Sequence, residues 1–215
     1  MNILIAESNI TKGEQTRQAI LDAAVIRFAR EGYRSASIAD IARDAGVGNT
    51  ITYAYFKNKE ALFLAAVDQD AAAHIRTGLV WVSDPREEEQ PIVANWQQRL
   101  FFTLVETSTQ HPLARRLLGG LEPEVTERVL EIPALQELRA ACADRLRVEQ
   151  VDGTVRIDID PLEMANGIVA IMLALLMSVV QLGSSATTGY ATEVAAVFSA
   201  ALQPPSAQRP PSLNG

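Results

Sequence analysis

The side chains with the clearest capacity for chemistry lie between Ser37 and Lys59, and that chemistry is the binding of a polyanion. Ser37 and Tyr53 carry hydroxyl groups and Lys59 carries an ammonium, and all three suit the phosphate oxygens of nucleic acid. Small or polar residues interleave with them and fit contacts to base edges or to a groove: Asn49, Thr50, Thr52 and Ala54. The set suits a surface that contacts a polyanion such as double-stranded DNA, and the alternative is that Lys59 is solvated, Ser37 is a helix cap and Tyr53 is a packing residue.

Two short helices joined by a tight turn would position these side chains, which is the pattern of a helix-turn-helix. Ser37 can cap the first helix. Gly46 supplies the left-handed backbone conformation that the turn needs, and Asn49 or Thr50 can cap the second helix, which runs to Phe56. This second helix would enter the major groove, which is wide enough for a helix with its side chains.

Longer helices are expected on both sides of this pair. Apolar residues at helical spacing predict a helix over residues 14–31 that Gly32 ends. Asn58 can cap a fourth helix over residues 59–82. Ala42 permits close packing where helices cross, because its side chain is a single methyl group.

The net charge of −7 disfavours a nucleic-acid partner, but the charges are unevenly distributed. Residues 10–60 contain eight Lys or Arg and six Asp or Glu, whereas residues 61–215 contain eleven Arg and nineteen Asp or Glu. This asymmetry indicates a basic head that meets a polyanion and an acidic body that does not.

A set of residues at fixed spacings in the first third of the chain carries a family resemblance. The set is Ile20, Leu21, Ala23, Ala24, Phe28, Gly32, Tyr33, Ser37, Ile41, Ala42, Ala45, Gly46, Val47, Tyr53, Tyr55, Phe56, Lys59, Glu60, Ala61 and Leu62. In this combination, residues 17–62 closely resemble the DNA-binding head of the tetracycline-repressor (TetR) family. The resemblance implies an all-α fold of about nine helices, with a three-helix head and a helical body that binds a ligand and dimerises.

The resemblance also implies roles for single residues. Tyr53 and Lys59 would contact the DNA backbone, and Ser37 would donate to it similarly. The helix that reads bases departs from the family, which usually shows Gly-Thr-Leu-Tyr where this chain has Thr-Ile-Thr-Tyr at 50–53. Ile51 removes a hydroxyl from the groove-facing edge, so the base preference cannot be transferred from any relative.

Beyond residue 60 the periodicity predicts a helical body. The expected helices cover residues 92–107, 113–118, 124–130, 133–148, 162–182 and 190–202. Alternating apolar residues at 155–159 would in isolation indicate a β-hairpin. However, Gly153, Arg156 and the Asp-Pro pair at 160–161 resemble the turn that leads into the penultimate helix of TetR proteins.

The expected organisation is a flexible arm at 1–12, the helix-turn-helix domain at 13–60, the body at 61–203 and a disordered tail at 204–215. The last two predicted helices carry more apolar groups than a surface helix needs, so some should meet a second copy. The dimer candidates are Met164, Ile168, Ile171, Leu175, Val179, Leu182, Val194, Val197 and Phe198.

A pocket for a small apolar or amphipathic ligand would lie inside the body, lined by apolar and aromatic groups. Its candidates are Trp81, Trp96, Phe101, Phe102, Glu106, Met172 and Met177. An ordinary core explains the aromatic and Met residues equally, because such side chains at helical spacing are commonly buried.

The sequence contains no motif for catalysis, a metal or a cofactor. His74 and His111 are isolated, and no nucleophile motif or Gly-rich phosphate loop occurs. Lone Cys142 excludes an internal disulfide framework and is expected in the core of a cytoplasmic protein. The uncharged run at 164–192 could indicate a membrane span, but polar and Gly residues interrupt it, which favours a buried helix.

These observations predict a ligand-responsive transcriptional regulator and not an enzyme. A homodimer would repress by occupying a palindromic operator in two successive major grooves. A small molecule bound in the body would tilt the fourth helix and change the spacing of the two heads. The alternative is a helical dimer that binds small molecules or proteins and has lost specific DNA binding.

Overall fold

A computed structural model describes residues 11–83, 96–125, 127 and 130–204. Over these ranges the chain forms nine α-helices and one short 3-10 helix, without a β-strand. The prediction of an all-α fold with about nine helices is confirmed. Parts of four predicted segments lie outside the described residues: the N-terminal arm, the start of the helix expected at 92, the helix expected at 124–130 and the C-terminal tail.

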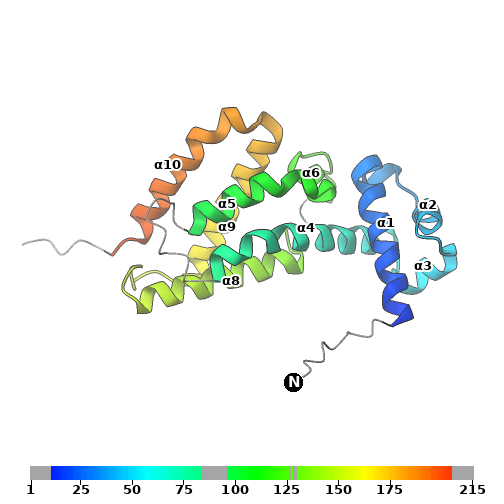
Figure 1. Cartoon of the computed structure of the whole chain (residues 1–215), viewed down its shortest axis with the longest axis horizontal. Coiled ribbons are helices and arrows are strands. Elements are labelled where there is room, and N and C mark those ends of the chain that lie inside the picture. Colours follow the sequence, from blue (N-terminus) through cyan, green and yellow to red (C-terminus); the bar gives the residue numbers. More distant parts are fainter. Residues whose placement is uncertain (1–10, 84–95, 126, 128–129, 205–215) are drawn as a thin grey trace, which may run out of the picture. The chain divides into compact units, whose positions relative to one another are not determined.

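The first helix, α1 (Lys12–Ser35), begins with a capping box and carries the core of the head (Figure 1). The Thr11 hydroxyl accepts from the Glu14 N–H, and the Glu14 carboxylate accepts from the Thr11 N–H. Its buried face consists of Ile20, Leu21, Ala24, Phe28 and Gly32. Gly32 breaks the helix instead of ending it, because its φ of +81° interrupts the helix and helical residues resume up to Ser35.

The next two helices, α2 (Ile38–Asp44) and α3 (Asn49–Tyr55), form the helix-turn-helix (Figure 1). Ser37 caps α2, as predicted. Gly46 has a φ of +69°, which confirms the left-handed turn position. The expectation that Asn49 or Thr50 caps α3 is wrong, because the cap is Gly48 and no side chain takes part.

The fourth helix, α4 (Lys59–Ser83), starts where the sequence predicts. The Asn58 side-chain oxygen accepts from the Ala61 N–H at 2.8 Å. The chain divides into two compact units. The head unit comprises the residues up to His74 together with Thr107–Ala134, and the body unit comprises Ile75–Glu106 together with the residues from Leu135. Helix α4 therefore contributes to both units.

A carboxylate on α4 organises the second segment of the head unit. Helix α6 (Pro112–Leu118) follows a short 3-10 turn, η2 (Ser108–Gln110). One oxygen of Asp70 accepts from the N–H groups of Leu113 and Ala114, at 2.9 and 2.8 Å. Because the first N–H groups of a helix have no partner within it, Asp70 acts as a cap supplied by another helix.

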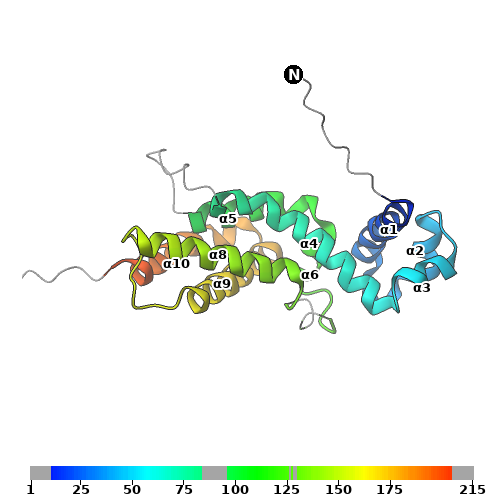
Figure 2. The same ribbon diagram turned by 90° about the horizontal axis from the view of Figure 1, so that it is seen from below.

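The body unit is built from α5 (Trp96–Thr107), α8 (Pro133–Val151), α9 (Pro161–Leu182) and α10 (Ser184–Leu202), with the last part of α4 (Figure 2). Gly78 lets α5 approach α4 closely, because a Cβ at this position would lie 2.5 Å from a methyl carbon of Leu100. Helix α10 packs against α9.

The connection from α8 to α9 is a turn that leads into α9, as the resemblance implies, and not a hairpin. The Asp160 carboxylate caps α9 by accepting from the N–H groups of Leu162 and Glu163, both at 2.8 Å. The Arg156 N–H donates to the carbonyl of Leu202, which fastens this connection to the end of α10. No strand forms in this segment, so the hairpin alternative is excluded.

Candidate nucleic-acid interface

Helix α3 presents nearly all of its side chains to solvent. Asn49, Thr50 and Ala54 are exposed, and Tyr53 is 50% exposed. Ile51, which was not among the predicted DNA contacts, is 46% exposed on the same helix. Four predicted contact residues therefore lie on a free surface of the helix-turn-helix.

Thr52 is a wrong prediction of a DNA contact. Its side chain is fully buried and is the single buried side chain of α3. Its hydroxyl has no hydrogen-bond partner among the described residues. Thr52 therefore fixes α3 against the core and cannot reach a groove.

Ser37 and Lys59 already bind within the protein. The Ser37 hydroxyl accepts from the Asp40 N–H at 3.1 Å, which leaves its own proton for an outside acceptor. The Lys59 ammonium donates to the carbonyl of Arg34 at 2.8 Å and lies 5.0 Å from the centre of the Tyr33 ring. Lys59 thus joins the start of α4 to the end of α1.

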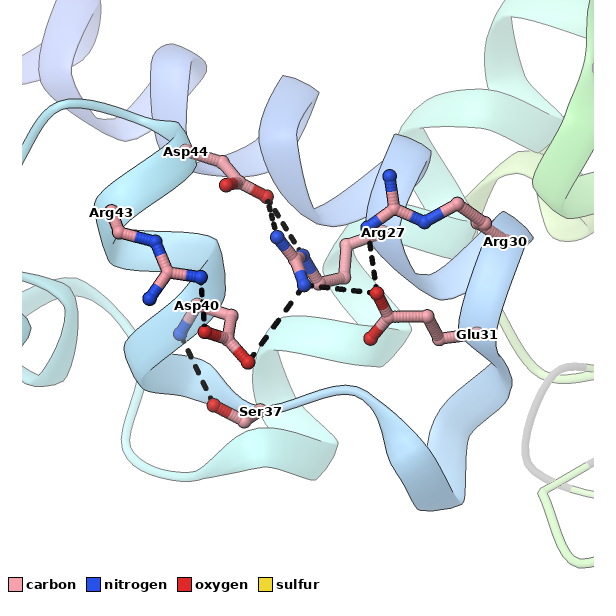
Figure 3. A network of polar contacts seen from close by, with 7 residues as sticks. All are labelled: Arg27, Arg30, Glu31, Ser37, Asp40, Arg43 and Asp44. Carbon is pink, nitrogen blue, oxygen red and sulfur yellow. Dashed lines mark hydrogen bonds and ion pairs between the residues drawn. The ribbon is translucent and has the colours of Figure 1, made fainter.

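A cluster of ion pairs, which the sequence does not reveal, holds α2 against α1 (Figure 3). Arg27 on α1 donates to Asp44 at 2.5 and 2.7 Å and to Glu31 at 2.9 Å. Its guanidinium also lies 3.8 Å from Asp40. Arg27 and Asp44 are far apart in the sequence, so no local spacing indicates this pair, whereas the Asp40 and Arg43 pair has helical spacing.

Charge pairing in this cluster shifts two pKa values in the stabilising direction. The hydrogen bond to Asp44 raises the pKa of Arg27 above its ordinary value. The hydrogen bond from Arg43 lowers the pKa of Asp40. Both groups therefore stay charged at neutral pH, and the helix-turn-helix is held to α1 by fixed charges.

The two histidines, isolated in the sequence, meet in the head unit. The rings of His74 and His111 are stacked with centres 4.8 Å apart, and His111 Nδ1 lies 3.3 Å from an oxygen of Asp70. The prediction that they are isolated is wrong, because α4 and the segment before α6 bring them together. Among the described residues, no group of three His, Cys, Asp or Glu could hold a metal ion.

A hollow in the body unit unites two predicted sets of residues. It lies among α5, α9 and α10 and is lined by Gln97, Gln98, Phe101, Phe102, Met172, Leu175, Val194, Ala195 and Phe198. Phe101, Phe102 and Met172 come from the predicted pocket, and Leu175, Val194 and Phe198 from the predicted dimer set. Gln97 is buried, and its side-chain oxygen has no partner among the described residues.

The other pocket candidates do not line this hollow. Glu106 is exposed, which removes it from any enclosed site. Trp81 is half-buried and donates to the Thr103 hydroxyl at 2.9 Å. Trp96 is buried, which fits the core role that the sequence left open, and Met177 is half-buried.

The dimer candidates fall into three groups by burial. Ile168 and Phe198 are buried within the chain, so they serve the core of the subunit instead of a partner. Leu182, Val197 and Ile171 are exposed. The intermediate candidates are Met164, Leu175, Val179 and Val194.

Helix α9 is only partly covered by the rest of the chain. By length and composition alone it could cross a membrane, and it is the one such helix among the described residues. Only 28% of its most apolar window is buried. Burial of α9 within one chain is therefore incomplete, and the expectation that a second copy covers part of this helix stays a prediction.

Comparison with known proteins agrees with this geometry. The family profile described as bacterial regulatory proteins, tetR family, matches residues 20–66, which include α2 and α3. The HTH-type transcriptional repressor Rv1474c of Mycobacterium tuberculosis is 30% identical over 147 residues, and the match covers 66% of this chain and 71% of that protein. The chain belongs to the TetR family. It is a DNA-binding transcriptional regulator, and the resemblance drawn from its sequence is confirmed.

Other relatives of this TetR-family chain match over shorter segments. The HTH-type transcriptional regulator AcrR of Shigella flexneri is 39% identical over 59 residues, which is 27% of each chain. The HTH-type transcriptional regulator BetI of Agrobacterium fabrum is 32% identical over 80 residues, which cover 36% of this chain and 39% of that protein. The chain thus matches less than half the length of these two relatives.

Solved TetR-family structures share the fold of nearly the whole chain. A regulator from Mesorhizobium loti aligns with a TM-score of 0.66 over 90% of this chain and 99% of its own, at 20% identity. A regulator from Rhodococcus sp. aligns with a TM-score of 0.62 over 88% and 99%, also at 20% identity. The low identity limits this likeness to the fold.

Proposed function

We propose that this TetR-family chain is a homodimeric repressor that occupies a palindromic operator and releases it when a small molecule binds the body unit. The observation that carries the DNA-binding part is the free face of α3. Asn49, Thr50, Tyr53 and Ala54 are exposed there, while Thr52 anchors the helix to the core. A helix held on one side and free on the other can enter a major groove.

The apolar face of α9 and α10 supports the homodimer. Ile171, Leu182 and Val197 expose large aliphatic side chains on these two helices, Val197 by 61%. A second copy that covers this face would remove apolar surface from water in both subunits, because a two-fold interface uses the same patch twice. Two recognition helices are needed to read a palindrome.

The hollow among α5, α9 and α10 supports an uncharged ligand. Aromatic and aliphatic side chains make up most of its lining, and none of its lining residues is charged. The amide oxygen of Gln97 could accept a hydrogen bond from a hydroxyl or N–H group of the ligand. A ligand there would displace α5, which meets α4 where Leu100 packs on Gly78. Because α5 packs on α4, a displacement of α5 would push on α4 and could produce the proposed tilt.

Binding of the full chain to the DNA upstream of its own gene and its neighbours tests the proposal. Fluorescence anisotropy at several salt concentrations should show tight binding to one duplex that weakens steeply as salt rises. Tyr53→Ala should weaken that binding, whereas Val148→Ala, equally exposed on α8, should not. Weak binding that ignores both sequence and the Tyr53 substitution would favour the interaction-dimer alternative.

Two further measurements test release and its mechanism. Uncharged aromatic compounds that raise the thermal stability should also dissociate the operator, and Ala195→Phe, which fills the hollow, should abolish this effect while DNA binding persists. Nitroxide labels at Ile26→Cys, a position of α1 that is 63% exposed, should change their separation between the two subunits on ligand binding. An unchanged separation with full release would exclude the tilting mechanism.

A further inference from the structure

The recognition helix α3 has no charged side chain. Its sequence, NTITYAY, contains no Lys, Arg, Asp or Glu. Arg or Lys to guanine is the commonest specific contact in the major groove, and Asp or Glu is the usual acceptor for the cytosine amino group. Helix α3 thus lacks both groups that distinguish G·C pairs most strongly.

Burial fixes which side chains of α3 point outward. Because successive helical residues turn by about 100°, Thr50 and Ala54 lie opposite the buried Thr52, with Ile51 and Tyr53 on the two flanks. The hydroxyl of Tyr55 lies against the start of α1, where a Cβ on Gly13 would be 3.4 Å away. The outward face therefore carries no charged side chain.

Two basic residues near α3 have partners elsewhere in the head unit, and a third follows the end of the helix. Arg43 pairs with Asp40 at 2.5 Å, and the Arg17 guanidinium lies 5.3 Å from the centre of the Phe56 ring. Lys57 is exposed just after the last residue of α3, at a place that suits a phosphate. The face that enters the groove is left to neutral side chains.

We propose that α3 reads an A·T-rich half-site and that Ile51 packs on the C5-methyl group of a thymine. An exposed aliphatic side chain in a major groove loses contact with water, and the thymine methyl is the apolar group that the groove offers. Asn49, the one side-chain amide on α3, can bond both N6 and N7 of an adenine. This inference rests on the proposed function, because it requires specific DNA binding by α3.

Selection of bound duplexes from a randomised pool tests the composition of the site. The expected result is a palindrome whose half-sites are enriched in A·T pairs under α3. Half-sites with conserved G·C pairs throughout would overturn the inference and leave the regulator function intact. Recovery of no preferred sequence would overturn the function as well.

A thermodynamic cycle then tests the contact of Ile51. Single thymines of the selected site are replaced by deoxyuridine, which removes only the methyl group. At one position this should weaken wild-type binding about fourfold but leave Ile51→Ala unaffected. Equal sensitivity in both proteins, or no sensitive position, would refute the contact. The circular dichroism spectrum of Ile51→Ala should match that of the wild type, since the side chain is exposed. Ile51→Arg should shift the base selected at the thymine position toward G.

Discussion

The Lys59 ammonium donates a hydrogen bond to the carbonyl oxygen of Arg34. Lys59 is the first residue of α4 and Arg34 lies in the last turn of α1, so this bond joins the two helix ends. The same group is the proposed phosphate contact. A phosphate can bind it by sharing the three ammonium protons or by displacing the carbonyl. The two roles predict different results for substitutions that keep or remove the charge.

Lys59→Met should lower the slope of log affinity against log salt by about two for a dimer, because each phosphate contact contributes about 0.9. Lys59→Arg should keep the slope, since the charge remains. Salt titrations of operator binding measure both variants. An unchanged slope in Lys59→Met would show that Lys59 serves only the end of α1.

Thr52→Val should raise the free energy of unfolding by about 1 kcal/mol, because it removes a buried hydroxyl that has no partner among the described residues. Operator affinity should not change. Urea denaturation measures the stability, and Thr50→Val on the exposed side is the control, expected within about 0.5 kcal/mol of wild type. A loss of stability in Thr52→Val would mean that the hydroxyl has a role that the fold does not reveal.

Asp70→Ala should lower the free energy of unfolding by about 1 to 2 kcal/mol, the usual cost of a lost helix cap. Two N–H groups of α6 lose their acceptor, and His111 loses a neighbouring carboxylate. Asp70→Asn keeps an acceptor oxygen and should lose less. Urea denaturation of both variants, beside Asp152→Ala at an exposed position, decides the matter. Equal stability of Asp70→Ala and wild type would contradict the capping role.

Ile171→Glu should convert the proposed dimer to a monomer, because it places one carboxylate from each subunit in a shared apolar face, where the two charges would lose hydration and repel across the two-fold axis. Sedimentation velocity measures the change. Val151→Glu is the control, since Val151 is 87% exposed at the end of α8 and does not belong to the proposed interface helices α9 and α10. If both variants remain dimers, the subunits meet through another surface.

Cys142 should react with thiol reagents only when the protein unfolds. Burial raises its pKa from 9.0 to about 12, so the folded protein lacks the reactive thiolate at pH 8. Between about pH 9 and pH 12 the unfolded thiol ionises while the folded one does not, so stability should fall as the pH rises through this window. Modification at pH 8 with and without urea measures the accessibility. Rapid labelling of the native protein would contradict its burial.

Local signals in the sequence were sufficient for the helices of the head. The caps at Ser37 and Asn58 and the turn at Gly46 each depend on one residue and its neighbours, and all three are confirmed. The third cap was missed because Gly48 caps α3 without a side chain. A sequence pattern cannot show a cap that uses the backbone alone.

Long-range pairings account for most of what the sequence did not predict. Arg27 pairs with Asp44, and His74 stacks on His111. Neither pair has the sequence spacing of neighbours on one helix, so no local pattern indicates the contact. The residue type of Thr52 suggests a groove contact, whereas its position on α3 turns it into the core. Burial separates Thr52 from Thr50, although the two side chains are chemically identical.

The break at Gly32 limits how the head can be cut from the chain. Beyond it, the Tyr33 N–H donates to Glu122, and Arg116 joins the same carboxylate and reaches the carbonyl of Ala29. A fragment that stops at residue 60 would lose all of these partners, and the end of α1 that holds Lys59 would fray. Residues 1–60 are therefore not expected to form a stable DNA-binding domain by themselves. A chimaeric regulator built from the head would also need residues 107–134.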